Sequence, residues 1–393
     1  MVITIKRIIY TAILVLYPFT IFCQDTYLGL YSEDHGEIFD ALDEIVENHD
    51  KNAIEILHSL ILTQTPYIQL NYLEVLSELG DQEIITYVNE FIDRSNEFSS
   101  HEYREDPLEM KVEGTELLME NNDFSTIEYV FEYYDLYKPN FTSLQADVLD
   151  LFPIIAKNVP DKIMIIKENL ILVLHNSNNE HTRFAALFYL DEIFGSSIID
   201  QFIWAIEDTY YSIRSFSIDK LSGYQSPELN SLLKERLAIE PGNSLRAQIA
   251  EILLTNFGNP SDLKSVTEYQ PIEQHKIASS RIEYSIIEFI PPRLTVSTSE
   301  MITNLIGYTD ELYQYGWITE TTIYNQYLDY LKDIEKAYSN KEKELLCEKL
   351  DEYLDFTEGL HNSPLLTEEG YKFMHYHGTY IKENVEEEFG ECE

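Results

Sequence analysis

The sequence predicts an all-α protein, in which a solenoid of stacked helix pairs precedes a small antiparallel helical bundle. Three observations predict this fold class. Apolar residues recur every three to four positions along most of the chain, which is the period of an amphipathic helix. One pattern recurs in the middle of the chain at intervals of 31 and 32 residues, as it does in repeat architectures. Four further helical runs, separated by short turns, follow Pro291 and Pro292.

The first 23 residues have the layout of a secretory signal. A short basic start precedes an apolar run that Pro18 interrupts and that is short for a membrane span. Cleavage after Cys23 would leave Gln24 as the first residue of the mature chain. Acylation of Cys23 is the alternative, but such signals have a small residue before the cysteine and Phe22 is bulky. We therefore expect a secreted, extracytoplasmic protein, with lipid attachment to the cell surface as the alternative.

Acidic side chains dominate the composition. The chain has 70 Asp and Glu against 27 Lys and Arg, which gives a formal net charge of −43. Such a surface repels nucleic acid and anionic lipid, so we expect neither as a partner. It also attracts cations, but no segment has the alternating acidic spacing and central glycine of a calcium loop. We interpret the acidity as that of a solvated exterior, and we expect no transmembrane span after the signal.

The repeated pattern places an arginine before a leucine seven residues later. It occurs in "HTRFAALFYL", "SIRSFSIDKL" and "SLRAQIAEIL", which contain Arg183, Arg214 and Arg246. A spacing of seven returns to the same face of a helix. Further apolar helices, such as "SPELNSLLKERLAI", lie between these segments. Helix pairs of this length bury their apolar faces only by stacking, which predicts a solenoid.

These segments resemble the HEAT-repeat family of paired-helix solenoids. In that family an acidic residue in the turn and an arginine opening the second helix often form a ladder between neighbouring repeats. The positions that match are Arg183, Arg214, Arg246, Asp208 and Glu240. Each acidic residue stands six residues before an arginine, whereas the first unit has Ser177 there. The resemblance implies that the arginines are structural; a comb of arginines that binds anions is the alternative, which the negative surroundings disfavour.

The array is expected to span residues 24–266. Towards the N-terminus it continues in degraded form, with Gln69 and Gln145 where the arginine would stand. Residues 267–296 break the pattern and are expected to be a linker or cap. The run "RIEYSIIEF" within them is rich in β-branched and aromatic residues, which favours a strand or an irregular cap.

Residues 297–393 are expected to form the bundle, with an acidic tail and a domain boundary near residue 292. The stretches "LYQYGWITETTIYNQYLDYLKDIEKA" and "LLTEEGYKFMHYHGTYI" resemble the FIMAH-type helical domain of secreted bacterial proteins, over residues 297–388. The resemblance implies an appended, non-catalytic module of an extracellular protein. The positions that we expect at the centre of this bundle are Trp317, Leu331, Leu350 and Tyr371.

Residues with catalytic or metal-binding potential do not form a recognisable constellation. His375 and His377 are two apart on an expected helix, so they point in different directions and make a poor metal pair. Cys347 lies among leucines, which favours a packing role. A disulfide with Cys392 would be compatible with an extracytoplasmic protein, but the place of Cys392 in an expected tail argues against it. We assign no catalytic, cofactor-binding or metal-binding residues.

The sequence thus favours a non-enzymatic scaffold that binds a protein or peptide on the solenoid face. Two alternatives remain. One is adhesion to a glycan or surface polymer through the clusters of the 29 tyrosines, although tyrosines also fill ordinary cores. The other is an enzyme-accessory, lyase-like role, because some HEAT-like families act on cofactor-bearing proteins.

Overall fold

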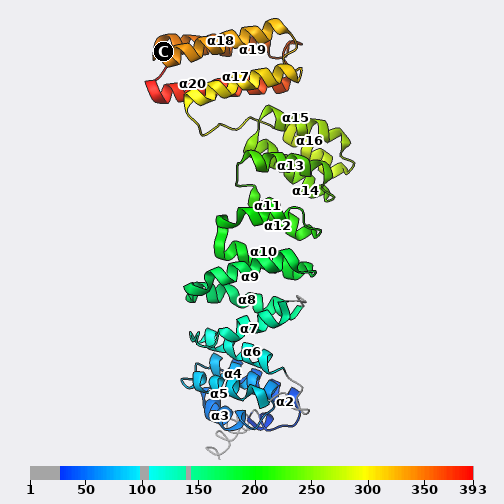
Figure 1. Ribbon diagram of the computed structural model, residues 1–393, viewed down its shortest axis with the longest axis vertical. Helices are drawn as coiled ribbons and strands as arrows, with labels where there is room; N and C mark the ends of the chain where they lie inside the picture. The colour runs from blue at the N-terminus through cyan, green and yellow to red at the C-terminus, as the bar shows by residue number, and fades with distance from the viewer. Residues whose placement is uncertain (1–26, 98–105, 139–142, 393) are drawn as a thin grey trace, which may run out of the picture. The chain divides into compact units, whose positions relative to one another are not determined.

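The computed structural model describes residues 27–97, 106–138 and 143–392. Over these residues the chain forms nineteen α-helices and no β-strand, which confirms the predicted all-α class (Figure 1). The expected signal segment and the start at Gln24 lie outside the described residues. Among the described helices, none combines the length and the apolar character that a membrane span requires.

The chain divides into two compact units, Met1–Ile198 and Ile199–Glu393. The helices of the first unit are α2 (His35–Glu47), α3 (Ile54–Ile61), α4 (Pro66–Glu78), α5 (Ile84–Arg94), α6 (Pro107–Glu120), α7 (Glu128–Tyr137), α8 (Ser143–Asn158), α9 (Ile163–Asn176) and α10 (Glu180–Phe194). From α3 onward successive helices pack on each other, and helices two apart also meet: α4 contacts α5 and α6, and α8 contacts α9 and α10.

Buried tyrosines connect distant segments inside the first unit. Tyr72 donates its hydroxyl hydrogen to the carbonyl of Leu30 at 3.0 Å, and Tyr134 donates to the carbonyl of Asn169 at 3.0 Å. Because a buried hydroxyl without a partner would destabilise the fold, these bonds fix both rings in the core. Two of the helices begin at aspartate caps, Asp34 and Asp106, whose carboxylates accept 2.8 Å hydrogen bonds from the amides two residues later.

The second unit begins with six helices that precede the bundle. They are α11 (Ile199–Ala205), α12 (Tyr211–Leu221), α13 (Pro227–Ile239), α14 (Asn243–Ile252), α15 (Pro260–Tyr269) and α16 (Lys276–Ile287). Helices α12, α14 and α16 pack one after another, and α13 packs on α15. The unit therefore contains two neighbouring rows of helices, with the turns between them at one end of each helix pair.

The segment that was expected to be a strand or an irregular cap is helix α16. Two of its residues, Ala278 and Ile282, stand four apart and are buried, and the helix packs on α14 and α15. A spacing of four suits a helix and not a strand, in which residues two apart share a face. Burial on neighbouring helices thus outweighs the strand preference of the β-branched and aromatic residues.

The chain that follows α14 packs closely against the segment that leads to the bundle. The helix continues into one wide π-helical turn, Leu253–Phe257, and ends at Gly258 with a left-handed φ of 57°. A Cβ atom on this glycine would collide with the ring of Pro292, which belongs to the segment between α16 and the bundle. The predicted boundary near residue 292 therefore lies inside the second unit, in a segment packed against the end of α14.

Four long helices complete the second unit: α17 (Thr298–Gln314), α18 (Thr321–Asn340), α19 (Lys343–Leu360) and α20 (Glu368–Phe389). Each packs on the next, and α20 returns to pack on α17, so the four close into a bundle (Figure 1, yellow to red). Leu331 and Leu350 are fully buried at its centre, as predicted. Trp317 and Tyr371 are only partly buried, because Trp317 lies in a turn and Tyr371 directs its hydroxyl to Glu358.

The end of the chain is not a free tail. Helix α20 extends to Phe389 and carries Cys392 back to the N-terminal part of α19, where it forms a disulfide with Cys347 (S–S 2.09 Å). The sequence left this pairing open, with the expected tail as an argument against it. The bond forms because helix α20 is long enough to return the chain to the start of its antiparallel neighbour.

Candidate functional site

The predicted arginines occupy one position in the fold. Arg183, Arg214 and Arg246 are each the fourth residue of their helix, in α10, α12 and α14. Gln69 is likewise the fourth residue of α4. At this position a long side chain can reach back to the turn that precedes its own helix, where carbonyl groups at the end of the previous helix lack intrahelical partners.

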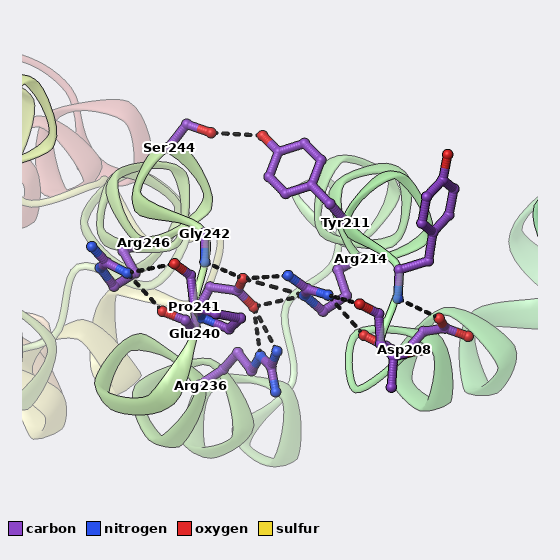
Figure 2. Close-up of polar contacts among 11 residues, drawn as sticks. Asp208, Tyr211, Arg214, Arg236, Glu240, Pro241, Gly242, Ser244 and Arg246 are labelled. Carbon is purple, nitrogen blue, oxygen red and sulfur yellow. Dashed lines mark hydrogen bonds and ion pairs between the residues drawn. The ribbon is translucent and has the colours of Figure 1, made fainter. Parts of the chain in front are cut away.

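Arg214 connects two successive turns of the second unit. Its Nη1 donates to the carbonyls of Asp208 and Thr209 in the preceding turn, both at 2.9 Å (Figure 2). Its Nε and Nη2 donate to the carboxylate of Glu240, at 3.0 and 2.9 Å, in the following turn. Because the Arg214 and Glu240 side chains are 5% and 0% exposed, this ion pair lies inside the fold.

Glu240 is the centre of this network. It lies at the C-terminal end of α13 and also accepts hydrogen bonds from Arg236 at 2.6 Å and from the amide of Gly242 at 2.7 Å. Burial of the carboxyl group opposes ionisation, but the bonds from Arg214, Gly242 and Arg236 outweigh burial and lower the pKa of Glu240. The carboxylate is therefore held charged, between two guanidinium groups (Figure 2).

Arg246 repeats the arrangement one helix pair later. Its Nη1 donates to the carbonyls of Glu240 and Pro241, at 2.8 and 3.0 Å, and its Nε and Nη2 donate to Glu273 at 2.5 and 2.8 Å. The hydrogen bond from Arg246 is the main cause that lowers the pKa of Glu273, to about 2. Glu240 thus bonds to three arginines: its carboxylate accepts from Arg214 and Arg236, and its backbone carbonyl accepts from Arg246.

The structure differs from the expected pairing at Asp208. This residue contacts Arg214 through its backbone carbonyl, while its carboxylate accepts a 2.7 Å hydrogen bond from the amide of Tyr210. The carboxylate partner of Arg214 comes from the next turn, because the backbone carbonyls of its own turn already occupy Nη1. Sequence reasoning missed Glu273, although it follows Arg246 by 27 residues as Glu240 follows Arg214 by 26.

The degraded units keep part of the contact. Arg183 donates to the carbonyl of Ser177, six residues earlier, at 3.0 Å. Gln69 donates to the carbonyl of Gln64, five residues earlier, at 2.7 Å and is buried. The backbone contact therefore survives where the first unit lacks an acidic residue in its turn, and even where glutamine replaces arginine. The side chain of Gln145 lies outside the described residues.

A buried carboxylate also connects the other row of helices. Asp262 in α15 accepts hydrogen bonds from Asn230 at 2.9 Å and pairs with Lys234 at 2.6 Å, both in α13. Its second oxygen accepts from the amide of Asn259 in a capping box. In both rows, polar bonds that bridge one helix pair to the next are shielded from water. An anion would have to displace Glu240 to reach Arg214, so the geometry favours a structural role for the arginines.

A groove lies between α14 and α16. Its volume is about 490 Å³, and it is lined by Glu251, Lys276, Ile277, Ser280, Arg281 and Tyr284. Ile277 and Tyr284 are 68% and 64% exposed and stand seven residues apart, so both large apolar side chains face solvent on the same side of α16. Arg281 bridges the two helices by donating to Glu251 at 2.8 Å.

The two bundle histidines lie in different surroundings. His377 is buried among aromatic rings, whereas His375 is partly exposed and its Nδ1 lies 3.6 Å from the carboxylate of Glu358. Across the part of the chain that the structure describes, no group of three or more His, Cys, Asp or Glu side chains could hold a metal ion.

No protein-family model matches this chain, and no curated protein has significant sequence similarity to it. Assignment of a function therefore rests on the geometry of the chain's own residues.

Proposed function

We propose that this protein is a secreted, non-enzymatic scaffold, built as a HEAT-like α-solenoid, that binds a peptide segment of a partner protein. The helix row α12, α14 and α16 provides the binding face. Contacts that recur from one helix pair to the next support the solenoid assignment: Arg214 and Arg246 each bind the turn before their helix and a carboxylate of the following turn. These arginine contacts hold adjacent helices at a fixed separation, which a preformed binding face requires.

The groove between α14 and α16 is the observation that carries this proposal. Ile277, Tyr284 and Ile287 are all more than 60% exposed on α16, and their spacing of seven and three places them along one side of the helix. Lys276 and Arg281 stand beside these apolar side chains. Apolar anchors with polar groups at the rim are the usual composition of a peptide-binding groove.

Peptide selection against the immobilised mature chain tests the proposal. Peptides recovered from a random library would be measured by fluorescence anisotropy against the wild type, Ile277→Asp and Ile239→Asp. Ile239 is the matched control, because it is also 68% exposed but lies at the end of α13, outside the groove. We expect Ile277→Asp to weaken binding at least about tenfold and Ile239→Asp to leave it unchanged. Equal affinities for all three proteins would refute the groove as the binding site.

The distribution of tyrosines supports a scaffold over an adhesin. Tyr72, Tyr134, Tyr327 and Tyr353 are among the largest fully buried side chains of the described residues. The tyrosine-rich composition therefore serves the core to a large extent. Among the exposed tyrosines, Tyr284 lies in the groove of α16. The FIMAH-like bundle fits an appended, non-catalytic module of such a protein, and surface attachment would follow from a lipid on Cys23.

A further inference from the structure

Helix α20 attaches the bundle to the segment that precedes it. Lys372 donates through Nζ to the carbonyl of Ile287 at 2.6 Å, at the C-terminal end of α16. Arg293 pairs with Glu383 and Glu387 of α20, at 3.3 and 3.1 Å. A cation at a helix C-terminus and an ion pair at the next segment hold α20 against residues 286–293 along several turns.

Three aromatic residues of the bundle complete this attachment. Tyr308 donates its hydroxyl hydrogen to the side-chain oxygen of Asn259, at the start of α15, at 2.8 Å. Tyr380 donates to the carbonyl of Pro291 at 3.0 Å. The ring of Phe373 lies 5.5 Å from that of Phe289 between centroids. We call Tyr308, Phe373 and Tyr380 the docking aromatics, because each contacts a residue outside the bundle.

His377 lies behind all three docking aromatics. Its ring centroid is 5.1 Å from that of Tyr308, 6.0 Å from that of Phe373 and 5.9 Å from that of Tyr380. The residue is 6% exposed, and its Nε2 has no hydrogen-bond partner among the described residues. This burial lowers the pKa of His377 to about 4, so the imidazole is neutral while the bundle is docked.

We propose that a proton on His377 releases the bundle from α15 and the 286–293 segment. The proton would place a charge among the docking aromatics, with no carboxylate bonded to the imidazole Nε2. Separation of the docking aromatics from Asn259, Phe289 and Pro291 would let water reach this charge, and it would do so without unfolding the bundle. Acid would thus loosen the connection while the bundle keeps its own helix–helix contacts and its disulfide.

The other ionisable groups on the elements that pack around His377 are not bonded to its imidazole Nε2. On α17, burial raises the pKa of Glu311, so its protonation in acid relieves a buried charge and opposes release. On α15, Asp262 is held by Lys234. Arg293 and Lys372 make their own bonds, to Glu383 and Glu387 of α20 and to the carbonyl of Ile287, and do not contact the imidazole. On α19, the buried Tyr353 donates to a backbone carbonyl of α20. A variant of His377 alone therefore isolates the effect.

Hydrogen–deuterium exchange of the full mature chain tests the proposal. Amides of residues 286–290 and of Arg293 would be compared at pH 7.5 and pH 5.3, both above the sequence pI of about 4.4. With a pKa of 6.5 undocked and about 4 docked, the opening equilibrium of the wild type should rise roughly tenfold over this interval. His377→Phe should show no such rise. At each pH the exchange rate of the wild type is divided by that of the variant, which cancels the intrinsic pH dependence of amide exchange. His375→Gln, on the same helix but partly exposed, should behave as the wild type.

An equal rise in the wild type and in His377→Phe would overturn the proposal. Should this variant misfold, the titration of the His377 ring protons by NMR in the wild type decides instead. Titration near pH 4 supports the proposal, and titration near pH 6.5 rejects it. Loss of exchange protection throughout α17–α20, rather than at residues 286–293, would also reject it, because the bundle would then unfold instead of undocking.

Discussion

Replacing Arg214 by alanine is expected to destabilise the second unit by about 3 kcal/mol. The substitution removes both guanidinium bonds to the buried carboxylate of Glu240, and it also leaves two backbone carbonyls of the preceding turn without their donor. Removing one partner of a buried ion pair costs about 3–5 kcal/mol. The lower end applies here, because Arg236 and the amide of Gly242 still bond to the carboxylate.

Urea unfolding followed by circular dichroism measures this loss, and Arg281→Ala is its matched control. Arg281 makes the same type of pair with Glu251, also between neighbouring helices, but their side chains are 45% and 37% exposed. Because exposed pairs contribute about 0–1 kcal/mol, the control should change the free energy of unfolding by less than about 1 kcal/mol. The difference between the two variants isolates the effect of burial.

A double-mutant cycle with Glu240→Gln sharpens the test. Arg214 and Glu240 should show a coupling energy of at least about 1 kcal/mol, because each loses its oppositely charged partner when the other is replaced. The reasoning is refuted if Arg214→Ala costs no more than Arg281→Ala, or if the two changes add without coupling. It is also refuted if Arg214→Ala abolishes peptide binding without a change in stability.

Three further predictions concern the rest of the second unit. Gly258→Ala should lower the free energy of unfolding in urea by at least about 2 kcal/mol, because alanine is strained at this left-handed φ and its Cβ would meet the ring of Pro292. The control Gly223→Ala, with open space around the glycine, should lower it by less than about 1 kcal/mol. Cys392→Ser should lower the free energy of unfolding of the bundle by about 4 kcal/mol, because the disulfide spans 45 residues, and adding reductant to the wild type should reproduce the loss. An isolated 297–393 fragment should melt cooperatively by circular dichroism, and Leu331→Ala should destabilise it by about 2–5 kcal/mol; a gradual melt would show that the bundle depends on its neighbours.

Local patterns were sufficient to predict most of the helices, α16 excepted, and the arginine positions. The arginine that opens each helix is visible as a side chain seven residues before a leucine, and the structure places all three at the fourth residue of a helix. Gln69 was identified from the same spacing. It makes the same kind of contact, because the fourth residue of a helix can bond to the preceding turn whenever its side chain carries a donor. These contacts span six residues or fewer, so the sequence contains them directly.

Contacts between distant residues could not be predicted in the same way. The carboxylate partner of Arg214 lies 26 residues along the chain, and a sequence this acidic offers many other candidates. The disulfide of Cys392 depends on the length of α20 and on its antiparallel packing against α19. The groove of α16 was missed because the segment was expected to be a strand or cap, and strand spacing would not have placed Ile277 and Tyr284 on one face.

The second unit uses buried ionisable groups in two opposite ways, and acid should affect them in a fixed order. His377 is buried neutral with a lowered pKa, so the stability it confers is complete above pH 6.5 and is lost as the pH falls towards 4. Glu273 is buried charged with a pKa lowered to about 2, so its contribution is complete above about pH 4.5 and is lost only below that value. The lowered pKa of Glu240 acts in the same direction as that of Glu273. Acidification should therefore loosen the docking of the bundle while the ion pairs of Arg214 with Glu240 and of Arg246 with Glu273 remain intact.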